Sequence, residues 1–341
     1  MYYSLSQIYS NYLSRLGSLT KFLLFMLFTA IYIYVAIHSM PSRNVKRPTT
    51  SKNRNITSKI MRQIEENGVD LYAIEEEMAL RREQIYTTCQ TYKYENILPN
   101  TWEFVVDAHH SLVWCKVFKA ASSTWIYYFN ILGGYEESYL RKGTYNPLKL
   151  LRSRFPRPTL SQLNAVLHSS LSFLIVREPL ERLLSIYQSL KSSLKDKYNS
   201  ELINKIKKHT FDDGNLSIND LTFKQFVKYV IESNIDEKPW TPLYKCCAPC
   251  TVNFTVIAKL ETLLEDQEYI IKRAGIEDIL NTAKVKLQYL AHKKVEHTSD
   301  YLELYYSELD FKLLNKLVEI YSVDYEMFQY NATKYYNYIR Y

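Results

Sequence analysis

Runs of apolar residues along the chain have the lengths and spacings of strands and helices in an α/β protein. Leu112–Phe118 and Leu171–Val176 combine β-branched, aromatic and aliphatic residues over the length of a buried strand. Glu103–Asp107 and Val252–Leu260 have a similar strand-like composition. We therefore expect a sheet built from these segments, with helices between them.

Helical spacing follows the two longer apolar strands. After the first come small residues and then the apolar and aromatic stretch Trp125–Leu132, which Gly133-Gly134 ends. After the second, Pro179 opens a helix with a single apolar stripe. Further helices are predicted at Ile60–Gln84, Phe223–Ile231, Glu261–Ala274 and Leu302–Phe328. The polar, lysine-rich segment Lys191–Asp220 is interpreted as an insertion.

An uncharged apolar run near the N-terminus predicts a membrane anchor. Phe22–Ile37 carries no charge and can be extended to position 40, which suits a thin bilayer. Tyr32 and Tyr34 within the run, and the lack of a small-residue cleavage site after it, favour an uncleaved anchor over a signal peptide. The basic, Ser/Thr/Asn-rich stretch 41–59 that follows has the composition of a linker.

The two sides of this span give conflicting signals for its orientation. More basic residues follow the span than precede it, which by the positive-inside rule places the C-terminal bulk in the cytosol. These residues are Arg43, Lys46, Arg47, Lys52 and Arg54. Four N-glycosylation sequons, at Asn55, Asn215, Asn253 and Asn331, and a cluster of cysteines favour the opposite orientation. The residues alone leave the orientation open.

Charge and composition narrow the class of partner. The formal net charge is +7 and the pI is about 8.9, so the surface favours anions such as polyanionic glycans, nucleotides, nucleic acid or anionic lipid. With 31 tyrosines and only 7 glycines the chain does not have the composition of a low-complexity tail. Six basic residues lie in Arg141–Pro158, which is either a solvated loop or the wall of a groove for a sulfated or carboxylated chain.

The five cysteines favour disulfides over a metal site. Cys247 and Cys250 have the spacing of half a zinc site, but no second Cys or His pair with ligand spacing accompanies them. We expect one or two disulfides, with an odd cysteine left over, among these two residues and Cys89, Cys115 and Cys246. The pairing cannot be assigned from the sequence.

Two strand–turn–helix junctions carry residues that suit phosphate binding. Lys119 follows the first strand, and the small residues after it let an anion approach backbone N–H groups and a helix N-terminus, with Ser123 or Thr124 as hydroxyl donors. No glycine fingerprint is present. Arg177 ends the second strand, and Ser185 lies in the helix after it. Arg177 is either a bidentate phosphate ligand or an ion-pair partner of a nearby glutamate.

The histidine pair His109-His110 is a less suitable acid–base candidate. Eight residues of strand separate Ser111 from Lys119, about 26 Å in extended chain. Ligands of open α/β sheets bind beyond the carboxyl ends of the strands. The two histidines, and likewise His168 before the next strand, are therefore expected at the wrong end of the sheet.

Several stretches, in this order, resemble the Golgi carbohydrate sulfotransferases, in the branch that contains the chondroitin 4-, HNK-1 and GalNAc-4 sulfotransferases. The resemblance covers most of residues 80–335, and its most specific part is REPLERLLS within SFLIVREPLERLLSIY. It also includes Arg81-Arg82, FVVDAHHSLVWCKVFKAASSTW, CAPC, VIAKLETLLEDQEYIIKRAG and YYSELDFKLLNKLVEIYSVDYEMFQY. Such a family implies a three-layer α/β sandwich with a central, mainly parallel sheet and a P-loop-like site for 3′-phosphoadenosine-5′-phosphosulfate (PAPS).

The resemblance also implies roles for residues at the two junctions. The 5′-phosphosulfate loop corresponds to Phe118, Lys119, Ala120, Ala121, Ser122, Ser123 and Thr124, and the 3′-phosphate ligands correspond to Arg177 and Ser185. Phe118 stands where the family usually has Pro, and Ser122-Ser123-Thr124 stands where it usually has Cys-Thr-Asn. These departures raise the question of whether Phe118 weakens activity.

The expected reaction is in-line transfer of the sulfuryl group from PAPS to a sugar hydroxyl, which releases 3′-phosphoadenosine-5′-phosphate (PAP). Lys119 is the catalytic residue, because its charge would offset the charge that develops on the leaving 5′-phosphate. No metal is expected. A general base should accept the acceptor's proton, and its candidates are Glu178, Glu181, His292 and His297.

By resemblance the chain is a single-pass type II protein of the Golgi membrane with a lumenal catalytic domain. We divide it into a cytoplasmic tail (1–21), a transmembrane signal anchor (22–40), a lumenal stem (41–85) and a sulfotransferase domain (86–341). The expected partner is an anionic glycan, either a chondroitin-like glycosaminoglycan (at N-acetylgalactosamine O-4) or an N-glycan, and not nucleic acid. The alternatives are a catalytically weakened glycan-binding relative and a type II Golgi glycosyltransferase.

Overall fold

The computed structural model describes residues 70–192, 197–210, 221–233, 239–280 and 298–339. The chain divides into two units, Met1–Ile60 and Met61–Tyr341, and all described residues belong to the second. The predicted anchor 22–40, the sequons at Asn55 and Asn215, and His292 and His297 lie outside the described residues. No helix within the described ranges is both long enough and apolar enough to cross a membrane.

A four-stranded mixed sheet forms the centre of the unit, with the strand order β1-β2-β3-β4. The strands are β1 (Phe104–Asp107), β2 (Leu112–Cys115), β3 (Leu171–Val176) and β4 (Val256–Lys259). β1 is antiparallel to β2, whereas β2, β3 and β4 are mutually parallel. The mainly parallel sheet is thus confirmed, and the carboxyl ends of β2, β3 and β4 meet at one edge.

Two of the predicted strands are shorter than expected. β2 ends at Cys115 and not at Phe118, because the chain turns there: the Ala120 N–H donates to the Val117 carbonyl. The residues before β4 likewise form a turn, in which the Val252 N–H donates to the Ala248 carbonyl. β3 has the predicted bounds, and all but its first residue are buried.

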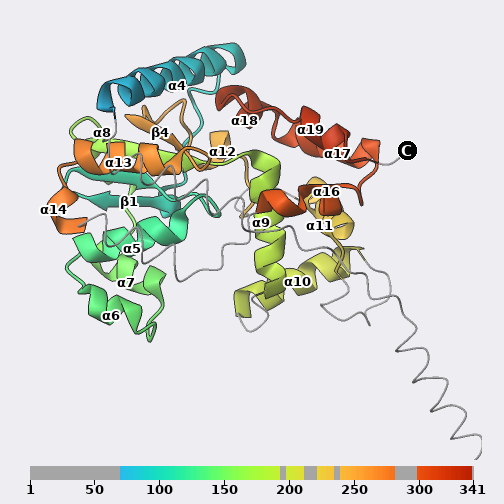
Figure 1. Ribbon diagram of the computed structural model, residues 1–341, viewed down its shortest axis with the longest axis horizontal. Helices are drawn as coiled ribbons and strands as arrows, with labels where there is room; N and C mark the ends of the chain where they lie inside the picture. Colours follow the sequence, from blue (N-terminus) through green and yellow to red (C-terminus); the bar gives the residue numbers. More distant parts are fainter. Residues whose placement is uncertain (1–69, 193–196, 211–220, 234–238, 281–297, 340–341) are drawn as a thin grey trace, which may run out of the picture. The chain divides into compact units, whose positions relative to one another are not determined.

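Helices cover both faces of the sheet (Figure 1). On one side lie α4 (Leu71–Tyr92) and α13 (Leu263–Arg273), which both contact β4. On the other side lie α5 (Ser122–Leu132), α6 (Glu137–Arg141) and α7 (Pro147–Arg154). The helices α8 (Leu160–Leu167), α12 (Leu243–Cys246) and α14 (Glu277–Leu280) and the 3-10 turn η1 (Thr101–Glu103) complete this part. Trp114 of β2 stacks on Phe129 of α5 and on Phe173 of β3, which fixes α5 on the sheet.

A second hydrophobic core lies around α9 (Pro179–Ser192) and is built from helices and the turns that join them. Its other elements are α10 (Lys197–Thr210), α11 (Phe223–Glu232), η3 (Thr298–Tyr301), α16 (Leu302–Tyr306), α17 (Phe311–Ile320), α18 (Ser322–Met327) and α19 (Thr333–Tyr336). The predicted single helix Leu302–Phe328 is wrong, because Asp310 caps a new helix by accepting a hydrogen bond from the Leu313 N–H. The predicted insertion Lys191–Asp220 contains α10, which packs Leu202, Ile203 and Ile206 into this core.

The segment Arg141–Pro158, for which a solvated loop and a groove wall were left open, is largely exposed but is helical rather than a loop. The segment contains the end of α6 and all of α7, which begins where the Asn146 side chain accepts hydrogen bonds from the Leu148 and Lys149 N–H groups. Arg152 from α7 donates to the carbonyls of Phe104 and Trp102 at 2.7 and 2.8 Å. Burial lowers the pKa of Arg152 to about 10.

The helix α4 belongs to the folded unit and not to a separate stalk. Met78, Arg81 and Ile85 are buried, and Arg81 donates to the Asp266 carboxylate at 2.7 Å and to the Ile257 carbonyl at 2.8 Å. A buried guanidinium needs such partners. Packing therefore begins near Leu71, ahead of position 86, while the division of the chain into tail, anchor, stem and catalytic domain stays a prediction.

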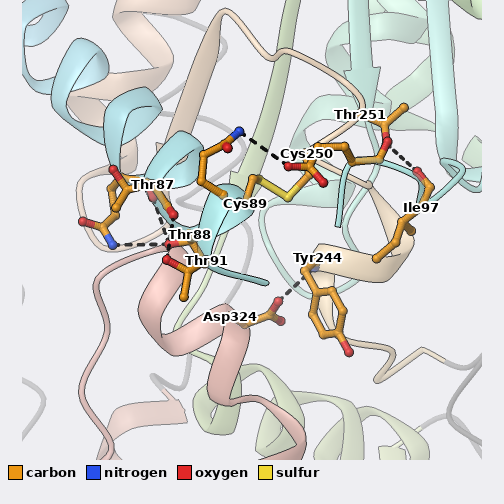
Figure 2. The surroundings of a disulfide bond; sticks show 12 residues. Thr87, Thr88, Cys89, Thr91, Ile97, Tyr244, Cys250, Thr251 and Asp324 are labelled. Atoms are coloured by element: carbon orange, nitrogen blue, oxygen red, sulfur yellow. Dashed lines mark hydrogen bonds between the residues drawn. A yellow bond between two sulfur atoms is a disulfide. The ribbon is translucent and has the colours of Figure 1, made fainter. Parts of the chain in front are cut away.

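Two disulfides join distant parts of the chain through the CCAPC segment. Cys89 of α4 pairs with Cys250 (Figure 2). Cys115 of β2 pairs with Cys247. Cys246 keeps a free thiol, and burial raises its pKa to about 12, so it stays protonated beside the second disulfide. The Sγ atoms of Cys115, Cys246 and Cys247 lie within 4.8 Å of one another, but two of them are bonded and offer no thiolate.

Removing the Cys89–Cys250 bond should lower stability. In the double variant Cys89→Ala and Cys250→Ala we expect the free energy of unfolding to fall by about 2–5 kcal/mol, because the bond closes a long loop in the unfolded chain. Urea unfolding followed by tryptophan fluorescence measures this change. Cys246→Ala is the matched control, and an equal loss in that variant would contradict the prediction.

Candidate anion-binding site

The turn between β2 and α5 presents unpaired backbone N–H groups. Lys119 and Ala121 both have left-handed backbone angles, with φ of 67° and 53°, so the helix begins at Ser122, earlier than predicted. No side chain caps this helix N-terminus. Among the described residues the N–H groups of Ala121, Ser122 and Ser123 have no backbone acceptor, whereas those of Ala120 and Thr124 do. Such a turn favours binding of an anion.

The side chains of this turn differ in accessibility. Ser122 is buried, Lys119 and Thr124 are half-buried, and Ser123 is exposed. Phe118 is 39% exposed, and the Lys119 ammonium lies 4.9 Å from the centre of its ring. A cation over a ring is weakly stabilised there. Phe118 thus keeps the ammonium of Lys119 beside the turn.

Arg177 follows β3 and is a buried guanidinium with weak partners. It is only 9% exposed. Its Nη1 donates to the Lys119 carbonyl at 3.3 Å, its Nη2 lies 3.8 Å from a Glu181 oxygen, and its Nε has no partner among the described residues. Burial lowers the pKa of Arg177, because the charged form loses its hydration. A guanidinium in this state is ready to bind an additional anion.

The structure brings Lys119 and Arg177 to the same edge of the sheet. The hydrogen bond from Arg177 joins the end of β3 directly to the β2–α5 turn. Ser185 is half-buried and lies four residues after Glu181 on α9, so the two share a helix face. Because Glu181 approaches Arg177, this face of α9 is the one that borders the site.

Glu178 is a buried carboxylate that links the site to the C-terminal helices. It accepts hydrogen bonds from the hydroxyls of Tyr325, at 2.5 Å, and Tyr335, and from the Glu181 N–H at 2.6 Å. Its own N–H donates to Glu261 at 3.0 Å. Burial raises the pKa of Glu178. Because it is buried and its oxygens are occupied, Glu178 is not an accessible general base.

Glu181 is held in a similar way, because it lies between Arg177 and Lys334. The Lys334 ammonium donates to its second oxygen at 2.8 Å. Both carboxylate oxygens of Glu181 therefore already face a cation. The other two candidates for the base lie outside the described residues, so the base stays unassigned.

Two functional candidates at the end of β4 were not predicted. Lys259 is the last residue of β4, opposite Val176 in the register, and Glu261 follows two residues later. The Lys259 ammonium lies 5.1 Å from the Tyr330 ring, and Glu261 accepts from the Tyr330 hydroxyl at 2.8 Å. Burial lowers the pKa of Lys259. The sequence could have revealed Lys259, because it shows there an apolar strand followed by a cation. The same pattern identified Lys119 and Arg177.

The histidines lie away from this edge, as their distance along the strand predicts. His109 and His110 form the turn between β1 and β2, at the amino end of β2. The His110 Nδ1 atom lies 2.6 Å from an Asp107 carboxylate oxygen. His168 follows α8 and precedes β3. These residues stabilise local turns and do not approach Lys119.

Comparisons with known proteins agree with this geometry. Residues 102–331 match the profile of the sulfotransferase family. Carbohydrate sulfotransferase 11 of Rattus norvegicus is 27% identical over 283 residues, which cover 75% of this chain and 76% of the relative. The protein of the same name from Danio rerio is 28% identical over 285 residues (75% and 76%), and carbohydrate sulfotransferase 14 of Danio rerio is 28% identical over 234 residues (66% and 61%). No solved structure matches the chain.

Tyr335 lies just beyond the matched stretch, and its contact with Glu178 can be tested. Tyr335→Phe removes a donor from a buried carboxylate, so we expect the free energy of unfolding to fall by about 1–3 kcal/mol. The loss should grow as the pH rises above the ordinary pKa of a glutamate. The variant raises the pKa of Glu178 further, and stability contributed by a raised pKa is lost with rising pH.

Urea unfolding at several pH values measures both effects. Tyr336→Phe is the matched control, since that neighbouring hydroxyl donates to the exposed Asn315 side chain at 3.2 Å and not to a buried carboxylate. A loss in Tyr335→Phe that does not depend on pH would contradict the role given to Glu178.

Proposed function

The chain belongs to the sulfotransferase family, and from this premise we propose that it transfers the sulfuryl group of PAPS to a hydroxyl of a glycan. The observation that carries the proposal is the hydrogen bond between buried Arg177 and the carbonyl of Lys119, which joins two anion-binding elements at one sheet edge. Relatives named as carbohydrate sulfotransferases support a sugar acceptor.

In this proposal the β2–α5 turn holds the 5′-phosphosulfate. Within the part of the chain that the structure describes, the N–H groups of Ala121, Ser122 and Ser123 have no acceptor, and the α5 dipole favours a negative charge. The Ser123 and Thr124 hydroxyls add donors, while Phe118 and Ala120 shape the turn. Lys119 would offset the charge that develops on the 5′-phosphate oxygen as its bond to sulfur breaks, which lowers the barrier to transfer.

Arg177 and Ser185 are proposed to bind the 3′-phosphate. The unpartnered Nε and the long contacts of the Arg177 guanidinium leave donors for a bidentate bond to phosphate. Glu178 fixes the backbone from which Arg177 projects, through its hydrogen bonds to Tyr325 and Tyr335. We propose a metal-independent reaction, because cations of the chain already lie beside the phosphate-binding groups.

We further propose the acceptor and location that the family resemblance implies. The acceptor is an anionic glycan, with N-acetylgalactosamine O-4 of chondroitin or dermatan as the first choice and an N-glycan as the second. The protein would be a single-pass type II protein of the Golgi membrane, anchored by 22–40, with residues 86–341 in the lumen. Two disulfides, and exposed sequon residues at Asn253 and Asn331, support a lumenal domain.

Phe118 stands where the family usually has Pro, and this difference raises the question of whether the enzymatic activity is weakened. Its ring lies beside the Lys119 ammonium, and the turn keeps unpaired N–H groups. We therefore propose that the substitution is tolerated and that the chain is an active enzyme. Binding of a glycan without any turnover of PAPS would instead identify a weakened relative.

The roles of Lys119 and Arg177 predict loss of activity without loss of fold. Lys119→Ala and Arg177→Ala should each lower transfer of labelled sulfate from PAPS to desulfated chondroitin by at least about 100-fold. Lys116→Ala is the matched control, because Lys116 lies three residues before Lys119 and pairs with Glu103. Circular dichroism checks the fold. Near-normal transfer by either test variant would overturn the site.

Arg177 should also determine the preference for a 3′-phosphate. The wild-type chain should bind PAP about 10- to 100-fold more tightly than AMP, as expected for charge-assisted hydrogen bonds worth about 1.5–3 kcal/mol. In Arg177→Ala this ratio should fall close to one, and in Ser185→Ala it should fall partway. Calorimetric titration measures both ligands. Ser189→Ala, one helix turn farther along α9, should keep the full ratio, and an unchanged ratio in Arg177→Ala would refute the assignment.

A further inference from the structure

Three tyrosines form a stacked row beyond the C-terminal end of α5. The rings of Tyr135 and Tyr139 stack with their centres 6.0 Å apart, and those of Tyr139 and Tyr145 stack at 5.4 Å. The Arg154 guanidinium lies over the Tyr135 ring at 5.2 Å, at one end of the row. Tyr145, at the other end, is 56% exposed. The row therefore presents an aromatic surface to the solvent at Tyr145.

A hollow adjoins this row and contains an unsatisfied acceptor. Tyr127, Asn130, Tyr139, Thr144 and Tyr145 are among the residues that line it. Asn130 is fully buried, and its Nδ2 donates to the Pro147 carbonyl at 3.0 Å. Its Oδ1 atom has no hydrogen-bond partner among the described residues. A buried amide oxygen without a donor is costly, so a ligand in the hollow that reached Asn130 with a hydroxyl or amide N–H would relieve this cost.

The charge around the hollow is positive. Residues 133–158 carry six basic and two acidic side chains. Arg141 pairs with Glu137 at 2.6 Å, and Lys142 and Lys149 are exposed. The Arg157 guanidinium lies 4.2 Å from the centre of the exposed Trp102 ring. The surface thus combines rings with cations, as required by a ligand that has both apolar faces and negative groups.

We propose that the hollow and the Tyr145 ring form a subsite for a sugar of the acceptor chain some distance from the sulfated one. A pyranose has an apolar face for the ring, hydroxyls or an N-acetyl N–H for Asn130, and, in a glycosaminoglycan, a carboxylate for the lysines. This inference rests on the proposed function, because it assumes a glycan acceptor. It assigns a role to a surface that the PAPS site does not use.

The position of the subsite sets the length of glycan that can reach it. The turn proposed to bind the phosphosulfate lies at the start of α5, and Asn130 lies eight residues after Ser122 in the same helix. At about 1.5 Å per residue this is roughly 12 Å along the helix axis. A single sugar cannot occupy both places, whereas an oligosaccharide can. Long acceptors should therefore bind more tightly than short ones, and the additional affinity should come from their contact with Tyr145.

The test compares desulfated chondroitin disaccharide and dodecasaccharide as acceptors. In the wild-type chain the KM should be lower for the dodecasaccharide. In Tyr145→Ala the KM for the dodecasaccharide should rise about tenfold, which corresponds to about 1.4 kcal/mol. The KM for the disaccharide, which is too short to span both places, and that for PAPS should not change. Tyr145→Phe should behave as wild type, because the ring is kept.

Two controls show whether a negative result concerns the subsite or the proposed sulfotransferase activity. Tyr86→Ala removes a ring that is similarly exposed, at 61%, on the distant helix α4, and should leave every KM unchanged. Calorimetric binding of the dodecasaccharide to the wild-type and Tyr145→Ala chains needs no turnover, so it tests the subsite even if no sulfate is transferred. Equal binding by both chains, or equal wild-type affinity for the two lengths, would overturn the subsite.

Discussion

A buried carboxylate needs hydrogen-bond donors to replace the water that it has lost. In this structure the carboxylate of Glu178 has this requirement, and the elements packed around it supply the donors. It lies between the sheet and the all-helical core around α9, and its partners come from both sides. Tyr325 and Tyr335 reach it from the C-terminal helices, while its own N–H contacts Glu261 after β4. The two cores are joined at the residue that follows Arg177. The site can therefore be rigid although it lies at a junction.

The parallel strands supply the other half of the arrangement. Because β2, β3 and β4 run in the same direction, the residues that follow these strands lie together at one edge of the sheet. Lys119, Arg177 and Lys259 each follow or end a buried strand. A stretch of apolar residues that stops at a cation is visible in the sequence, which is why two of the three were predicted. The third was overlooked, although it has the same pattern.

What the sequence did not reveal depends on contacts between distant residues. β3 was predicted to the residue because its burial on both faces leaves a continuous apolar run. The helices α6 and α7 were missed, since their basic residues look solvated until Arg152 is seen to donate to carbonyls near β1. The cysteine pairing and the phenol partners of Glu178 are separated by more than a hundred residues, and no local pattern encodes them. The unpaired Oδ1 of Asn130 depends on how α7 packs against α5.

The positions of the Glu178 partners in the sequence also determine when, during synthesis, the anion-binding edge can form all of its contacts. Tyr325 and Tyr335 are translated 147 and 157 residues after Glu178, and Cys247 is translated 132 residues after Cys115. A nascent chain that has already produced the β2–α5 turn and Arg177 thus lacks the groups that hold them in place. The anion-binding edge is completed only after residue 335 has left the ribosome.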